Sequence, residues 1–97
     1  MKMYTNSEQT AKLIGLGFER PRLLYFGNKT IGDYAYTIGE LIEMLPEYSS
    51  IYDLSNMHTM ERCWYVGHIS TLNVSADELI DALYDMILRL KEEGVIL

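Results

Sequence analysis

Three side chains of this sequence could act as soft metal ligands or as a nucleophile and its base: His58, Cys63 and His68. Thiol catalysis needs the imidazole within hydrogen-bonding reach of the sulfur. Cys63 and His68 fall in one predicted strand, an odd number of residues apart, and successive strand side chains point to opposite faces. The spacing therefore argues against a Cys/His nucleophilic pair and against a shared metal, unless a bulge at Gly67 changes the alternation.

For each candidate residue we favour a structural role over a catalytic or metal-binding one. We expect His58 to lie in a loop near solvent and Cys63 to act as a small core hydrophobe. The ridge Asp77, Asp81 and Asp85 could hold a divalent cation, but its spacing is equally that of a solvated helix face.

Phosphate-binding and acid/base motifs are also missing from the sequence. Gly15-Leu16-Gly17 lacks the later glycine and lysine of a phosphate loop. The carboxylates fall on apparent outer faces rather than converging. We therefore predict no catalytic residue, no metal, no cofactor and no small-molecule ligand. The chain is not expected to be an enzyme.

Composition narrows the class of protein. The chain has 97 residues and a net charge of −6, so contact with phosphate backbones is disfavoured and no nucleic-acid partner is expected. No apolar run is long enough to span a membrane, and the first residues lack a signal-peptide core. The single cysteine excludes an internal disulfide and favours a cytoplasmic location. We expect one small domain over residues 1–97, with residues 1–5 loosely held.

The strongest structural signal is a C-terminal helix over residues 76–93. Ser75 followed three residues later by Glu78 predicts a capping box, and Gly94 predicts the helix end. A helical stripe of apolar residues is expected to be buried; its members are Ala76, Leu79, Ile80, Leu83, Met86, Ile87 and Leu90. Leu88 lies off this stripe and Tyr84 lies on its flank.

Two further helices and four strands complete the prediction. Helices are expected at residues 6–16 and 38–45, the second capped by Thr37 with Glu40. The strands are expected at 23–26, 33–37, 50–54 and 62–69. The fold class is α+β in the order α-β-β-α-β-β-α, with a four-stranded, mainly antiparallel sheet packed by the helices.

Aromatic residues gather in the predicted strands. The last strand is apolar on both faces, with Trp64 and Val66 on one side and Tyr65 on the other, whereas a sheet with one solvated face should alternate. Either the helices divide between the two faces, or they pack on one and the other meets a second molecule. The candidate interface residues are Tyr34, Tyr36, Trp64, Tyr65, Tyr84 and Leu88.

Two likenesses involve the helical segments. Residues 37–45 and 75–83 share a cap, a glutamate and a Leu-Ile pair; a duplicated ββα unit or two independent capping boxes would explain this. In addition, KLIGLGF with Pro21, TIGELIEMLP and ELIDALYDMILRLKEEG resemble segments of uncharacterised small proteins from phage-like mobile elements of gut bacteria. That resemblance implies a genetic context and no activity.

The function expected from the sequence is a non-enzymatic protein–protein interaction or regulatory module that binds a protein partner or itself as a homo-oligomer. One alternative is an acidic inhibitor that imitates nucleic acid and blocks a DNA-binding protein. Another is a small enzyme that uses Cys63 or His68.

Overall fold

The computed structural model describes residues 2–21, 23–24, 34–53, 63–70 and 72–96. Its elements along the chain are α1 (Ser7–Gly15), β1 (Leu23–Leu24), β2 (Tyr34–Ala35), α2 (Ile38–Met44), β3 (Ser49–Asp53), β4 (Trp64–His68), β5 (Asn73–Ala76) and α3 (Leu79–Glu92). The fold is α+β, as the sequence predicts. The predicted loop residue His58 lies outside the described part of the chain.

The single four-stranded sheet is a prediction that the structure corrects. The described strands form two separate antiparallel sheets, a short β1-β2 ladder and the sheet β3-β4-β5. The hairpin between the first two strands is present, with Leu23 opposite Ala35. The difference arises from an additional strand, β5, which pairs with β4 in place of the first hairpin.

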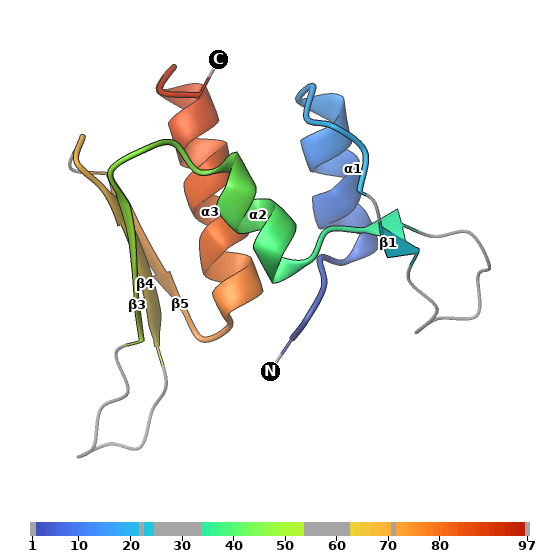
Figure 1. The fold of residues 1–97 in the computed structure, drawn as a ribbon, viewed down its shortest axis with the longest axis horizontal. Helices are drawn as coiled ribbons and strands as arrows, with labels where there is room; N and C mark the ends of the chain where they lie inside the picture. The colour runs from blue at the N-terminus through green and yellow to red at the C-terminus, as the bar shows by residue number, and fades with distance from the viewer. Residues whose placement is uncertain (1, 22, 25–33, 54–62, 71, 97) are drawn as a thin grey trace.

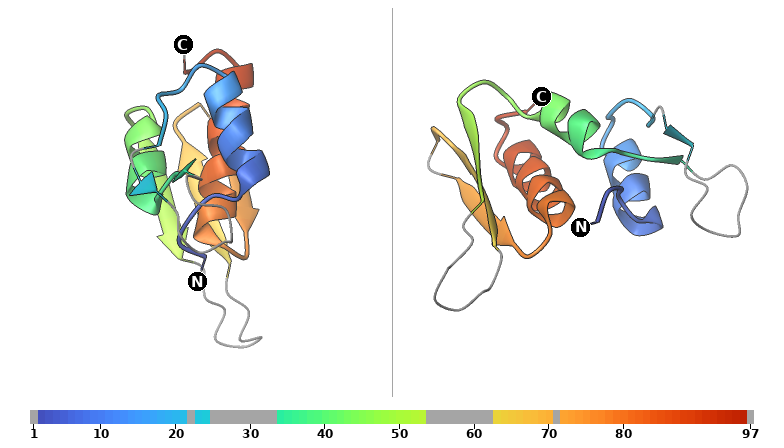
Figure 2. Two further views of the ribbon diagram at one scale, coloured as in Figure 1. Left: turned by 90° about the vertical axis from the view of Figure 1, so that its right-hand side faces the viewer. Right: turned by 60° about the horizontal axis from the view of Figure 1, so that its bottom comes forward.

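The elements stack in layers (Figure 1). The β3-β4-β5 sheet forms one outer layer, and α3 packs on one of its faces. On the opposite side of α3 lies α1, with the β1-β2 ladder beyond it, and α2 packs against α3 in front of the space between the two helices. Figure 2 shows the same order from two further directions. The described helices therefore do not divide between the two faces of the β3-β4-β5 sheet.

The core forms around α3, as its apolar stripe predicts. Six members of the predicted stripe are buried: Leu79, Ile80, Leu83, Met86, Ile87 and Leu90. They pack with Leu13 of α1, Leu41 of α2 and Val66 of β4, each of which has no exposed surface. One helix thus joins the sheet to the other helices by burying apolar surface on several sides.

The predicted start of the last helix is wrong. Residues 73–76 form β5, the helix begins at Leu79, and its N-cap residue is Glu78 without a side-chain capping bond. Val74 pairs with Val66 and packs against the core, and Ser75 pairs with Tyr65. Pairing with β4 satisfies backbone groups that a capping box would otherwise serve, while it also buries the apolar side of the strand.

The start of α2 and the end of α3 agree with the sequence. Thr37 and Glu40 form the predicted capping box of α2. At α1, the structure adds a capping box between Asn6 and Gln9. At the end of α3, Gly94 adopts a left-handed φ of 77°, and the N–H of Val95 donates to the carbonyl of Leu90 over 2.9 Å. This is the Schellman arrangement that glycine favours.

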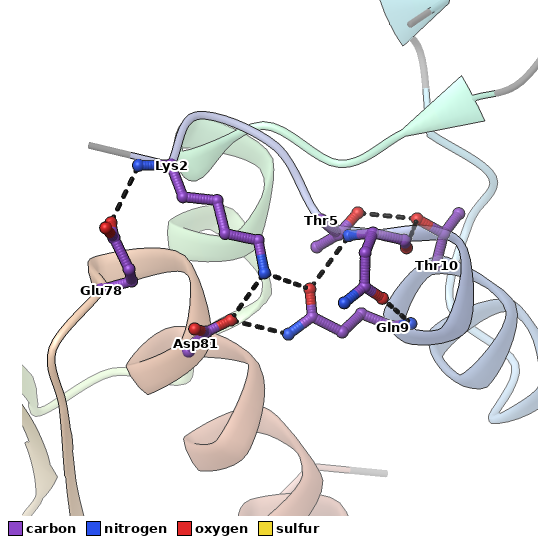
Figure 3. A network of polar contacts seen from close by, with 7 residues as sticks. Lys2, Thr5, Gln9, Thr10, Glu78 and Asp81 are labelled. Atoms are coloured by element: carbon purple, nitrogen blue, oxygen red, sulfur yellow. Dashed lines mark hydrogen bonds and ion pairs between the residues drawn. The ribbon is translucent and has the colours of Figure 1, made fainter. Parts of the chain in front are cut away.

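Polar contacts tie the N-terminal segment to α3 (Figure 3). The Lys2 backbone N–H donates to Glu78 Oε2 at 2.8 Å, and Lys2 Nζ lies 2.9 Å from Asp81 Oδ1. Gln9 of α1 donates through Nε2 to the same Asp81 oxygen at 2.8 Å. We expected residues 1–5 to be loosely held, but in the structure Lys2 forms a bridge between α1 and α3.

A chain of hydroxyl groups joins the same segment to Tyr36, the residue after β2. The Tyr36 N–H donates to Thr5 Oγ1 at 2.9 Å, and Thr10 Oγ1 donates to the Asn6 carbonyl at 2.8 Å. Because the proton of Thr10 is used in that bond, the 2.7 Å contact between the two threonine hydroxyls has Thr5 as its donor. Both threonines are buried, and this chain of bonds satisfies them.

Candidate functional site

The candidate site is the face of the β3-β4-β5 sheet that points away from α3. Burial of Val66 identifies the inner face, and strand alternation puts Trp64 on that side and Tyr65 on the other. Tyr52 lies directly opposite Tyr65 in the β3-β4 register, so both tyrosines belong to the outer face. Figure 1 shows no described helix on this side of the sheet.

The two tyrosines form a cross-strand pair. Their ring centroids lie 6.0 Å apart with the planes tilted by 46°, a favourable arrangement for aromatic rings. The Tyr65 ring also covers Gly67: a Cβ added to that glycine would lie 3.2 Å from the ring. Gly67 therefore leaves the space in which Tyr65 lies flat on the sheet, and Tyr52 stays 53% exposed beside it.

A second apolar pair lies at the end of the same ladder. The Ile69 N–H donates to the Tyr48 carbonyl at 3.2 Å, and both side chains are 71% exposed. This bond continues the β3-β4 register by one step, so alternation places Ile69 on the side of Tyr65, while Tyr48 marks the end of the ladder. Tyr48 has a φ of 67°, the left-handed region that costs a side-chain-bearing residue about 1 kcal/mol. We call Tyr48, Tyr52, Tyr65 and Ile69 the outer patch.

The outer face is not uniformly apolar. Ser50 lies opposite Gly67 between the two pairs, and Ser75 lies opposite Tyr65 on β5. The inner face, in contrast, carries Ile51, Val66 and Val74, which pack in or against the core. The face of the sheet toward α3 is therefore apolar. The outer face is mixed, because tyrosines alternate there with small residues.

Of the six candidate interface residues from the sequence, Tyr65 lies in the outer patch. Trp64 points to the inner face and packs against the core, and Tyr84 and Leu88 are half-buried against the same core. Tyr36 is 1% exposed, so its side chain belongs to the interior. The backbone of Tyr34 is in β2, and its side chain lies outside the described part of the structure.

Buried surroundings change the ionisation of two of these tyrosines. Burial, with a smaller contribution from Glu40, raises the pKa of Tyr36, whose hydroxyl donates to the Glu19 carbonyl. Burial, followed by repulsion from Asp85 and Glu8, raises the pKa of Tyr84. Both phenols stay protonated at neutral pH, so they act as hydrogen-bond donors and packing groups.

Three outer-patch residues were missed as site residues. Tyr48, Tyr52 and Ile69 are visible in the sequence as apolar residues at or near predicted strands, but their exposure depends on the register and on the position of α3. Strand alternation around Val66 is the sequence signal that could have identified Ile69, because it puts Trp64 and Tyr65 on opposite faces and Ile69 on the same face as Tyr65.

His68 has a structural role in the turn after β4. Its Nδ1 lies 2.8 Å from Ser70 Oγ and accepts from the Ser70 N–H at 3.1 Å. An accepting Nδ1 makes Nε2 the protonated nitrogen, which then donates to the Glu47 carbonyl at 3.0 Å. Both ring nitrogens therefore stabilise the chain around the turn. This use of Nδ1 differs from a general base that is held ready to accept a nucleophile's proton.

Cys63 and the acidic ridge show no arrangement for catalysis in the described parts of the chain. The Cys63 sulfur contacts the adjacent Trp64 carbonyl at 3.9 Å. Asp81 is paired with Lys2, while Asp77 precedes α3. Among the described residues, no group of three or more His, Cys, Asp or Glu side chains could hold a metal ion.

The neighbouring acids Asp81 and Asp85 have opposite electrostatics. For Asp81, burial acts to raise the pKa, but hydrogen bonds from Lys2 and Gln9 and the Lys2 charge outweigh it, so the pKa is lowered. For Asp85, burial and repulsion from Asp81 raise the pKa against the opposing effect of Arg89. Asp81 is therefore a compensated charge and Asp85 is not fully compensated.

A scan against protein-family models and searches of curated proteins and of solved structures find no match to this chain. The resemblance to proteins of phage-like elements stays a prediction. Within the described ranges, no helix has the length and apolar character needed to cross a membrane.

Proposed function

We propose that this chain is a non-enzymatic interaction module that binds a protein partner, a second copy of the chain included, through the outer patch. The observation that supports this proposal is the pair Tyr52 and Tyr65 on a sheet face that no described helix covers. Tyrosines contribute large contact areas while their hydroxyl groups remain hydrogen-bonded, and they are enriched in protein interfaces.

The form of the outer patch also fits a contact surface. Along the ladder, the small residues Ser50 and Gly67 lie between the tyrosine pair and the end where the exposed residues Tyr48 and Ile69 are joined by their backbones. Residues held in strained backbone conformations are concentrated at functional sites, and Tyr48 is such a residue. The single cysteine is the basis on which we propose a cytoplasmic location.

The acidic alternative is less well supported. Imitation of nucleic acid needs carboxylates that are available on one surface. Glu40 is used in the cap of α2, Glu78 accepts a bond from Lys2, and Asp81 is paired with the Lys2 ammonium group. An enzyme based on His68 is likewise less well supported, because both of its ring nitrogens are engaged within the turn.

The proposal is tested by site-specific photo-crosslinking in cells. A photoreactive phenylalanine analogue replaces Tyr52, and a matched control carries it in place of Ile42, which is also exposed but lies on α2. We expect discrete crosslinked species from position 52 and none of the same mass from position 42. Mass spectrometry of the species distinguishes a second copy from a different protein. Equal crosslinking at both positions, or none at position 52, would contradict the proposal.

A further inference from the structure

A second surface lies at the edge of β5, separate from the outer patch. In the sheet order β3-β4-β5, the strand β5 pairs on one side with β4. Figure 2 (left) shows β5 at the margin of the molecule, where no described element lies along its other side. The His68 N–H donates to the Leu72 carbonyl at 3.0 Å, which fixes the phase of the ladder. By alternation, Val74 bonds toward β4 and the backbone groups of Ser75 point outward.

A groove runs between this edge and α3. It has a volume of about 530 Å³ and is lined by Asn73, Val74 and Ser75 of β5 and by Asp85, Leu88, Arg89 and Glu92 of α3. Leu88 is the residue that lies off the buried stripe of the helix, and here it provides apolar surface beside the strand. An added strand would have its backbone against β5 and alternate side chains over the groove.

The charges around the groove indicate the kind of segment that fits. Asp85 and Glu92 outnumber Arg89, and the whole chain has a net charge of −6. The incomplete compensation of Asp85 agrees with a place for a further cation. A second copy of the chain would bring the same two carboxylates to the same edge, and like charges placed opposite each other oppose such pairing.

We propose that the edge of β5 accepts an extended basic segment of another protein as an additional antiparallel or parallel strand. Backbone hydrogen bonds at Ser75 provide the attachment. Apolar side chains of the segment contact Leu88, and its lysine or arginine side chains reach Asp85 and Glu92. This binding site is independent of the outer patch, so either proposal can fail without the other.

The test uses the full chain and two synthetic peptides of about eight residues, the length of an ordinary strand. One peptide carries lysine and valine in turn at every second position, so that both kinds of side chain face the groove, with threonine at the positions between; the other peptide has glutamate in place of each lysine. Each is titrated to about 1 mM into isotope-labelled protein while backbone amide shifts are recorded. We expect the lysine peptide to shift the amides of residues 73–76 and 85–92, and the glutamate peptide to leave them unchanged.

Two variants locate the binding. Ser75→Pro removes an N–H that points away from β4, so the ladder and the fold are retained while an added strand loses its bond; binding should be abolished. Glu92→Gln should weaken binding about two- to fivefold, whereas Glu93→Gln at the neighbouring exposed position should leave it unchanged. Circular dichroism confirms that each variant is folded.

Several results would overturn the inference. These are the absence of shifts with the lysine peptide, equal binding of the glutamate peptide, and undiminished binding by a folded Ser75→Pro variant. Shifts confined to Tyr52 and Tyr65 would also overturn it. Concentration-dependent shifts of the β5 amides without any peptide would show that a second copy occupies this edge, contrary to the proposal.

Discussion

Substitution of Asp81 by asparagine tests the bridge between α1 and α3. Asparagine keeps the shape and one acceptor oxygen but removes the charge that faces Lys2 Nζ at 2.9 Å. The two side chains of the ion pair are 31% and 37% exposed, so water screens their attraction. A pair of this kind contributes about 0.2–1 kcal/mol, and the bond from Gln9 to a charged acceptor adds to the loss. We expect the free energy of unfolding to fall by about 0.5–1 kcal/mol, or about 2–8 °C in Tm.

The pH dependence gives a second readout. The pKa of Asp81 in the folded protein lies below the ordinary value of 3.8, against the effect of burial, because Lys2 and Gln9 bond to the charged form. A lowered carboxyl pKa contributes stability above the unfolded pKa, and that contribution is lost as the pH falls through the folded pKa. The difference between wild type and Asp81→Asn should therefore be constant near neutral pH and shrink below about pH 3.8.

The assay is urea unfolding at a series of pH values, with a double-mutant cycle. Asp77→Asn is the control. This substitution removes the same charge from an exposed residue that lies just before α3. Combining Lys2→Met with Asp81→Asn should show a coupling of about 0.5 kcal/mol. Equal losses for the Asp77 and Asp81 variants, or additive effects of the Lys2 and Asp81 changes, would show that the bridge does not stabilise the fold.

Other substitutions test separate parts of the structure. Thr37→Ala should cost about 1 kcal/mol because it removes the cap of α2, whereas Ser75→Ala should stay within about 0.5 kcal/mol because Ser75 is in a strand; thermal unfolding measures both. Leu83→Ala should cost about 2–5 kcal/mol in urea unfolding, since its side chain is fully buried in the core cluster. Burial, followed by repulsion from Asp81, raises the pKa of Asp85 in the folded protein. The free energy of unfolding therefore decreases as the pH rises from the unfolded pKa through the folded pKa. Asp85→Asn should therefore raise Tm slightly at pH 7 and leave it unchanged in acid.

The sequence predicts local structure well where one residue or one bond decides it. Thr37 begins α2 with the predicted reciprocal capping bond, and Gly94 ends the last helix in a left-handed conformation. The burial of Leu83 and its neighbours follows from the spacing of apolar residues along one helix. The cap and the glycine turn depend on neighbouring residues alone, and the apolar stripe can be identified within the helix, although α1, α2 and β4 complete its burial.

The start of the last helix shows where local signals fail. Ser75 and Glu78 satisfy the capping pattern, but a strand that pairs with β4 competes for the same residues. The strand binds several backbone groups and also turns Val74 toward the core, whereas the capping box would satisfy two groups. Ser75 is drawn into β5 by this pairing, whereas Thr37 remains the N-cap of α2. The similar segments 37–45 and 75–83 therefore have different structures at their first residues.

The candidate interface required information that no local pattern contains. Trp64 and Tyr65 are neighbours, but one lies against α3 and the other faces outward because Val66 sets the phase of the strand. The sequence indicated two apolar faces without showing which one the helices cover. Since α3 covers the Trp64 face, the hypothesis of contact with a second molecule moves to Tyr65 and its partner Tyr52. Leu88 instead lines the groove beside β5. One part of its side chain packs against the core, and the exposed part offers contact surface for an added strand.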